Sequence, residues 1–312
     1  MQPPTADQFA VHRAEVADGL SLGYVREGVG GVPLLLIHGY PETMRIWWRN
    51  IAPLAEAGFE VIVPDLRGFG TSDLSADGVY DPPAYATDLH ALVHDVLGHD
   101  RCDVAGGDLG GVVLYDLGLR FGGFVDRQIF FNSVPPYLAD AYAAAGIPSD
   151  LDRLNRDSAD YFIRQGTDAD GLCAELDTPG RRRAYIADFY GHRLWGAPGA
   201  FDDEAKAFMT EPFADADRLR AAMAVYELTF GKRPLSDTPR LFETNPIPTV
   251  VLYGPEDHVV PDTHNAKCRV AFEECIGPFV VEGAGHFLQW EQAEVFNRTV
   301  RWFCADLLAA RG

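Results

Sequence analysis

The chain has 312 residues, of which 47% are hydrophobic and 23% are charged, and its formal net charge at pH 7 is −20. These proportions are those of a globular protein with a packed core, and they exclude a disordered chain. The negative charge argues against binding of nucleic acid or an anionic membrane, because both need clustered lysine and arginine, and it favours an uncharged substrate.

The cysteines and the N-terminus bear on the compartment. The five cysteines are odd in number and none has C-x-x-C or zinc-ligand spacing, which indicates free thiols in a reducing compartment. The first residues lack the basic start and apolar stretch of a signal peptide, and no apolar run is long enough to cross a bilayer. We therefore expect a soluble, cytoplasmic protein with no membrane partner, either a monomer or a homodimer.

Short apolar runs alternate with longer helical stretches through the first part of the chain. This alternation is typical of a mostly parallel sheet with helices on both faces. The expected elements, in chain order, are strand 32–37, helix 46–57, strand 59–63, helix 84–97, strand 102–105, helix 112–120 and strand 127–131.

The pattern changes at about residue 135. From there to about residue 240 the chain is helix-like, rich in alanine and aspartate, and interrupted by prolines. Strand patterns return at 248–253 and 279–281, before an amphipathic helix over 293–310. The simplest organisation is an α/β core made of residues 1–134 and 241–312, with a helical cap, residues 135–240, inserted between its two parts.

A glycine-rich turn follows the strand at 102–105. Asp108 stands within Gly106-Gly107-Asp108-Leu109-Gly110-Gly111, with glycine two positions before and two after it. A residue in a sharp strand-to-helix turn projects its side chain above the carboxyl edge of a sheet, and such a turn is crowded enough to need small neighbours. The motif predicts a catalytic nucleophile, although an ordinary turn or N-cap aspartate has the same local pattern.

Two later segments supply partners for Asp108. Asp257 lies in the loop after strand 248–253, with Glu256 as an alternative acid, and His286 lies in the loop after strand 279–281. The order nucleophile, acid, histidine is that of an α/β-hydrolase triad, and groups at the carboxyl ends of parallel strands meet at one edge of the sheet. We therefore predict an Asp108–His286–Asp257 triad.

An oxyanion hole is predicted beside this triad. The loop His38-Gly39-Tyr40-Pro41 follows the first buried strand. Its Tyr40 N–H and the Leu109 N–H could together stabilise a negative oxygen.

With these motifs the chain resembles the epoxide hydrolases of the α/β-hydrolase superfamily, over roughly residues 20–134 and 245–312. The resemblance implies an α/β-hydrolase fold with an inserted helical cap, and a hydrolase whose aspartate nucleophile forms an alkyl-enzyme ester. Its expected partners are a small-molecule epoxide and water, the product is a vicinal diol, and no cofactor is implied. It rests on 38–42 (HGYPE), 64–72 (PDLRGFGTS), the turn at Asp108, the acid at Asp257 and 285–287 (GHF).

The resemblance also implies roles in the cap. Relatives carry two cap tyrosines that hydrogen-bond the epoxide oxygen, and Tyr161 and Tyr226 match them by position. Tyr226 departs from the family's usual Tyr-Arg pair, because Glu227 follows it. Trp47 and Phe287 are expected to line the substrate pocket, with a core role equally compatible for Trp47.

Other functions share the motifs. Haloalkane dehalogenases look similar but have a tryptophan after the nucleophile and often an asparagine after His-Gly, where this chain has Leu109 and Tyr40. Fluoroacetate dehalogenases would need an arginine near the nucleophile, where it has Leu109 and Val112. A non-catalytic binding protein of the same fold is a minor alternative.

One spacing superficially suggests a metal site. His90 and His94 are four residues apart on an expected helix, with His99 nearby. No glutamate lies between them in a metalloprotease arrangement, so we interpret them as a solvated helix face and expect no metal.

Overall fold

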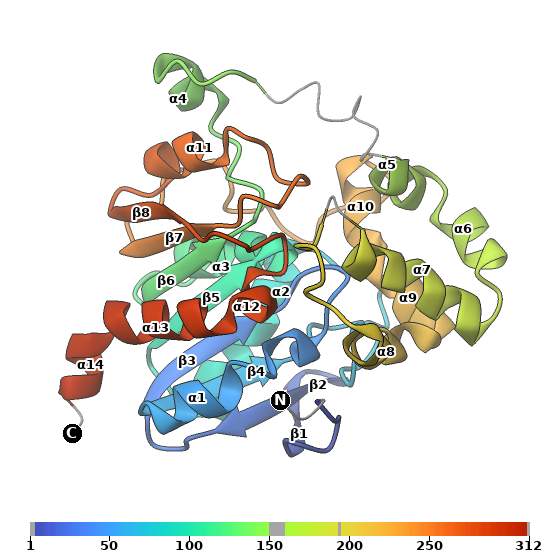
Figure 1. Cartoon of the computed structure of the whole chain (residues 1–312), viewed down its shortest axis with the longest axis horizontal. Helices are drawn as coiled ribbons and strands as arrows, with labels where there is room; N and C mark the ends of the chain where they lie inside the picture. The colour runs from blue at the N-terminus through green and yellow to red at the C-terminus, as the bar shows by residue number, and fades with distance from the viewer. Residues whose placement is uncertain (1–3, 150–159, 193–194, 311–312) are drawn as a thin grey trace.

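The computed structural model describes residues 4–149, 160–192 and 195–310 (Figure 1). An eight-stranded sheet with the order β1-β2-β4-β3-β5-β6-β7-β8 runs through its centre. The first three strands in this order pair antiparallel, and all later pairs are parallel. The strands are β1 (Val11–Ala17), β2 (Leu20–Glu27), β3 (Val32–Ile37), β4 (Phe59–Pro64), β5 (Cys102–Gly107), β6 (Val125–Phe131), β7 (Thr249–Tyr253) and β8 (Cys275–Val280).

Helices cover both faces of the sheet (Figure 1). α1 (Ile51–Glu56) and α13 (Ala293–Phe303) contact each other on one face, and α2 (Pro82–His90) and α3 (Asp108–Arg120) contact each other on the opposite face. Because both faces are covered, every residue of β3, β4 and β5 is buried, as expected of parallel strands. The predicted α/β-hydrolase fold is confirmed.

Several element boundaries differ from the sequence prediction. The helix expected at 84–97 is α2 followed by a π-helical turn at Ala91–Val96, and the terminal helix is divided into α13 and α14 (Ala305–Ala309). The helix expected at 46–57 is a 3₁₀ turn at Met44–Trp47 followed by α1. Among the described residues, no helix is long and apolar enough to cross a membrane.

Between β6 and β7 the described elements are helical. α4 (Ala139–Ala144) lies beside α11 (His264–Ala271), whereas the helices that we call the cap helices gather beyond one end of the sheet (Figure 1). The prolines and aspartates of this region begin helices: Thr178 caps α7 just before Pro179, and Asp202 and Asp215 cap α8 and α9. The cap helices are α5 (Asp160–Thr167), α6 (Ala169–Glu175), α7 (Pro179–Gly191), α8 (Asp203–Thr210), α9 (Ala216–Ala222) and α10 (Ala224–Thr229).

Candidate active site

Asp108 is the first residue of α3 and comes directly after β5. Its φ is 49°, a left-handed conformation that is strained in a residue other than glycine. The turn is also crowded, since a Cβ on Gly106 would lie 2.5 Å from the carbonyl oxygen of Gly110, and one on Gly110 would collide with the carbonyl oxygen of Ile37. The turn therefore needs glycine on both sides of Asp108, as the sequence predicts.

His286 lies between the two carboxylates of the predicted triad. Its Nδ1 is 2.9 Å from Oδ2 of Asp257, and its Nε2 is 3.3 Å from Oδ2 of Asp108. The geometry of the second contact is poor for a hydrogen bond, so the interaction with Asp108 is mainly electrostatic. The structure thus brings together all three residues, whereas the alternative acid Glu256 is exposed.

Asp257 is held so that it orients the histidine. It is buried, and its Oδ1 accepts the N–H groups of Val259 at 2.8 Å and Val260 at 3.1 Å. Its other oxygen faces Nδ1 of His286, which leaves Nε2 on the side of Asp108. Burial by itself lowers the pKa of His286, but the charges of Asp257 and Asp108 more than offset it and raise that pKa well above its usual value.

The predicted oxyanion loop, residues 38–41, contacts Asp108. The N–H of Tyr40 donates to Oδ1 of Asp108 at 2.6 Å. Leu109 lies in the first turn of α3, where helical N–H groups have no partner within the helix. The Tyr40 N–H therefore contacts the Asp108 carboxyl group, and the role of the Leu109 N–H stays a prediction.

Glu42 supports this loop and had no role in the sequence prediction. It is buried, its Oε2 accepts the N–H of Gly39 at 2.6 Å, and its Oε1 accepts a hydrogen bond from Gln289 at 3.0 Å. Burial raises the pKa of Glu42 to about 7. As the last residue of the HGYPE segment, it could have been suspected from its place beside the oxyanion loop.

The rings of the two tyrosines assigned from the family, Tyr161 and Tyr226, pack edge to face. Tyr226 is buried on α10, and its ring centroid lies 6.0 Å from that of Tyr161 and 5.0 Å from that of Tyr40. Burial, with the nearby Tyr161 and the Asp108 charge, raises the pKa of Tyr226 well above its usual value. Its hydroxyl group therefore stays protonated and able to donate.

Two further tyrosines, Tyr185 and Tyr190, lie on α7, and both have hydrogen-bond partners that explain their positions. The Tyr190 hydroxyl donates to the carbonyl oxygen of Pro41 at 2.5 Å, which fastens α7 to the oxyanion loop. The Tyr185 hydroxyl accepts a hydrogen bond from Gln165, whose amide also donates to the Tyr40 hydroxyl at 2.7 Å.

Trp195 connects the cap region to His286. Its carbonyl oxygen accepts the N–H of His286 at 2.6 Å, and its ring centroid lies 4.7 Å from that of His286, edge to face. Glu291 strengthens this connection, because its carboxylate accepts the N–H groups of both Gly285 and Ala197. Burial raises the pKa of Glu291 to about 7. No sequence motif predicts these contacts, which join segments about ninety residues apart.

The two predicted pocket residues have different surroundings. Trp47 is completely buried, with its ring 6.0 Å from that of Phe131 and 5.4 Å from that of Phe296. These are core contacts, as the alternative role of Trp47 predicts, and its role as a pocket residue stays a prediction. Phe287 is also buried, stacked on Tyr190 at 4.6 Å and beside His286 at 5.3 Å, and its role as a pocket wall stays a prediction.

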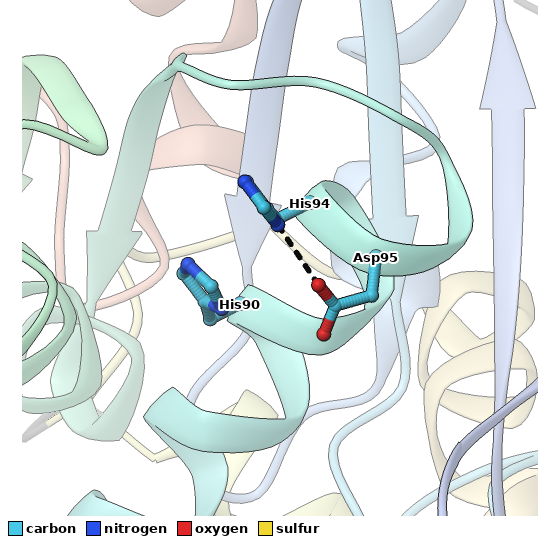
Figure 2. Close-up of side chains that lie close together, drawn as sticks. All are labelled: His90, His94 and Asp95. Carbon is cyan, nitrogen blue, oxygen red and sulfur yellow. Dashed lines mark hydrogen bonds and ion pairs between the residues drawn. The ribbon is translucent and has the colours of Figure 1, made fainter.

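The histidines with metal-like spacing lie at the junction of α2 and the π-helical turn (Figure 2). One ligand atom from each of His90, His94 and Asp95 lies within 4.8 Å of the others. The two imidazole rings, however, are stacked with only 16° between their planes, and His90 also stacks on Phe121 at 3.9 Å. Because imidazole lone pairs lie in the ring plane, stacked rings do not converge on one ion. His90 is thus partly a packing residue rather than simply a solvated one.

Comparison with known proteins places this geometry in a family. Residues 34–299 match the alpha/beta hydrolase family. Epoxide hydrolase A of Mycobacterium tuberculosis (strain ATCC 25618 / H37Rv) is 38% identical over 88% of this chain and 91% of that protein. Soluble epoxide hydrolase of Corynebacterium sp. (strain C12) is 36% identical, but that match spans only 40% of this chain and 42% of that protein. The solved structure of epoxide hydrolase CorEH without ligand superposes with a TM-score of 0.80 at 26% identity, covering 96% of this chain and 100% of the other.

Proposed function

The chain belongs to the α/β-hydrolase family, in its epoxide hydrolase branch, and on this premise we propose that it hydrolyses an uncharged epoxide to a vicinal diol through an alkyl ester on Asp108. One observation carries the proposal: an aspartate, rather than a serine, occupies the nucleophile turn, with His286 3.3 Å away and Tyr226 close enough for the Asp108 charge to raise its pKa. Carboxylate attack on carbon yields an ester that water must then cleave.

In the first half of the reaction, Oδ2 of Asp108 attacks one epoxide carbon and the bond from that carbon to the ring oxygen breaks. The ring oxygen takes a proton from Tyr226, assisted by Tyr161, because an alkoxide is a poor leaving group. Positioned acids of this kind typically accelerate a reaction by about 10²–10⁴-fold. The raised pKa makes Tyr226 a weaker acid than free tyrosine, but an alkoxide is basic enough to take its proton.

In the second half, His286 takes a proton from a water molecule, whose oxygen attacks the carboxyl carbon of Asp108. The N–H groups of Tyr40 and Leu109 stabilise the negative charge on Oδ1. The intermediate collapses, the leaving alkoxide takes the proton from His286, and the proton left on the carboxyl group returns to the tyrosinate. Esterification also removes the Asp108 charge, one of the influences that raise the pKa of His286, so that pKa falls before the ring is needed as a base.

The main rival is a dehalogenase with the same triad. A halide leaves without a proton, so a dehalogenase would have no use for a protonated tyrosine near the nucleophile, as Tyr226 is. Leu109 offers no side-chain N–H to a leaving halide either. These two observations favour the epoxide.

A panel of neutral epoxides and haloalkanes tests the function, with diol and halide measured in parallel. We expect diol from one or more epoxides, no halide, and no activity in an Asp108→Asn variant, which also excludes a contaminating enzyme. Halide release without diol from any epoxide would move the function to a dehalogenase. Neither product, together with measurable binding of the compounds, would point to a non-catalytic protein.

A further inference from the structure

Asn132 follows β6, the strand between β5, which leads to Asp108, and β7, which leads to Asp257. The residue is completely buried, and its φ of 39° lies in the left-handed region. Asparagine tolerates this conformation better than most other residues, although it still carries a cost. Asn132 and Asp108 are the two residues other than glycine with positive φ in the described chain.

The side chain of Asn132 hydrogen-bonds the main chain of both loops that follow β7 and β8. Its Oδ1 accepts the N–H of Gly254 at 2.9 Å, in the segment that leads to Asp257. Its Nδ2 donates to the carbonyl oxygens of Gly285 at 2.6 Å and His286 at 3.2 Å.

The main chain of Asn132 completes the set of contacts. Its carbonyl oxygen accepts the N–H of Asp108 at 3.1 Å. One residue therefore contacts the main chain at the nucleophile, in the acid loop and at the histidine.

We propose that Asn132 is a positioning residue of the triad, which sets where the His286 loop stands relative to Asp108 and Asp257. The proposal rests on the proposed function, because that function assigns His286 to hydrolysis of the ester. Attack of Asp108 on the epoxide does not use His286. A displaced histidine loop should therefore slow the second half of the reaction more than the first.

The chemistry of the side chain fits this role. The three contacts need one acceptor and one donor group on a short side chain, and a primary amide supplies both. A carboxylate at this position would have no N–H for the Gly285 and His286 carbonyl oxygens and would repel them. An apolar side chain would leave buried main-chain groups without hydrogen bonds.

Two variants test the role, with a matched control. Asn132→Gly removes the side chain while tolerating positive φ, and Asn132→Asp keeps the size but loses the donor. The control is Asn245→Ala: Asn245 is also completely buried, donates to Gln128 at 3.0 Å and accepts the N–H of Ile247 at 2.9 Å, but has no contact with the triad loops among the hydrogen bonds of the described chain.

Ester formation and ester decay are followed separately, by rapid quenching of a single turnover and intact-protein mass spectrometry. In both Asn132 variants we expect the ester to accumulate, with decay slowed by roughly 10–10²-fold and formation changed much less, because small misplacements of a catalytic group have effects of this size. Asn245→Ala should leave both rates unchanged. Equal slowing of the two steps, or normal decay in either Asn132 variant, would overturn the proposal.

A second readout needs no substrate. The ring-nitrogen chemical shifts of His286, assigned with a His286→Gln variant, should change in Asn132→Gly and Asn132→Asp and stay constant in Asn245→Ala. Unchanged shifts in the Asn132 variants would overturn the positioning role. If no epoxide reacts with the unmodified protein, the proposed function fails, but these shifts still decide whether Asn132 positions His286.

Discussion

The N–H of Tyr40 donates to Oδ1 of Asp108 at 2.6 Å, and this contact distinguishes the two oxygens of the carboxylate. Oδ2 lies on the other side, 3.3 Å from Nε2 of His286. In the proposed reaction, negative charge develops on Oδ1 when water attacks the ester, whereas Oδ2 forms the bond to the substrate. The two oxygens therefore have different fates in the proposed reaction.

The first prediction follows from the fate of Oδ2. If water attacks the carboxyl carbon of Asp108, the enzyme's own oxygen leaves with the product. A single turnover in water labelled with heavy oxygen should give an unlabelled diol and a labelled Asp108 peptide, as measured by mass spectrometry. Many turnovers should label the diol. Label in the diol from the first turnover would mean that water attacks the epoxide directly, contrary to the proposed ester.

The second prediction concerns Tyr226. Replacement by phenylalanine keeps its ring against Tyr40 and Tyr161 but removes the hydroxyl donor. Ester formation should slow by about 10²-fold, in the range of a lost acid catalyst, while ester decay stays near normal. Rapid-quench measurements separate the two steps. Tyr185→Phe is the control, because that hydroxyl accepts a hydrogen bond from Gln165, and similar losses in both variants would refute the assignment of Tyr226.

The third prediction concerns Glu227, the departure from the family's Tyr-Arg pair. Its carboxylate is nearly buried and accepts hydrogen bonds from Arg220 at 2.8 and 2.9 Å and from Arg233 at 2.5 Å. Arg233 in turn donates to the carbonyl oxygen of Gly78, which ties α10 to the core.

Glu227→Gln should therefore lower the free energy of unfolding by roughly 1–3 kcal/mol, since it removes a charge from two guanidinium partners. KM should rise as Tyr226 loses its fixed support. Chemical denaturation and steady-state kinetics measure the two effects. Glu175→Gln, which removes an exposed pair with Arg164, should change stability by less than about 1 kcal/mol, and equal effects of the two substitutions would contradict the prediction.

The fourth prediction concerns Asp103, a buried acid on β5 that the reaction does not use. Burial raises its pKa to about 7, although the Cys304 thiol and Arg127 act in the opposite direction. A raised carboxyl pKa means that the folded state holds its proton at a pH where the unfolded state has lost it. Stability should therefore fall as the pH rises from the unfolded value near 4 to about 7.

Asp103→Asn should make this decline shallower and should stabilise the protein at pH values above 7, by up to about 1.4 kcal/mol for each pKa unit removed. Denaturant titrations at several pH values measure the slope. Asp18→Asn, at an exposed position, is the matched control and should leave the slope unchanged. An unchanged slope in Asp103→Asn would show that Asp103 does not carry the predicted penalty.

The strands that are buried on both faces of the sheet are the parts of the fold that the sequence predicts best. β3, β4 and β5 are buried on both faces, so apolar residues predominate in them although Glu60 and Asp103 interrupt two of the runs, and the Asp108 turn follows β5 directly. The strands at the sheet edges are harder to predict. β1 is mostly exposed and has no apolar run, and β8 begins at Cys275, four residues before the expected strand, because Gly277 and Pro278 interrupt its apolar pattern.

The candidate site likewise has residues that the sequence predicts and contacts that it does not. The triad order is visible in the sequence because each member follows its own strand. The hydrogen bond from Asn132 to the carbonyl oxygen of Gly285 joins residues 153 positions apart, and no local sequence pattern encodes such a contact. Trp47 is the opposite case: it is near the oxyanion loop in sequence, but its ring is packed against Phe131 and Phe296 in the core.

The hydrogen bond from His286 to the Trp195 carbonyl oxygen has a mechanical consequence. Together with the hydrogen bonds of Glu291 to Ala197 and Gly285, it joins the main chain at Trp195 and Ala197 to the loop that carries His286. Movement of this stretch away from the core would therefore displace His286 from Asp108, and under the proposed mechanism it would slow hydrolysis of the ester.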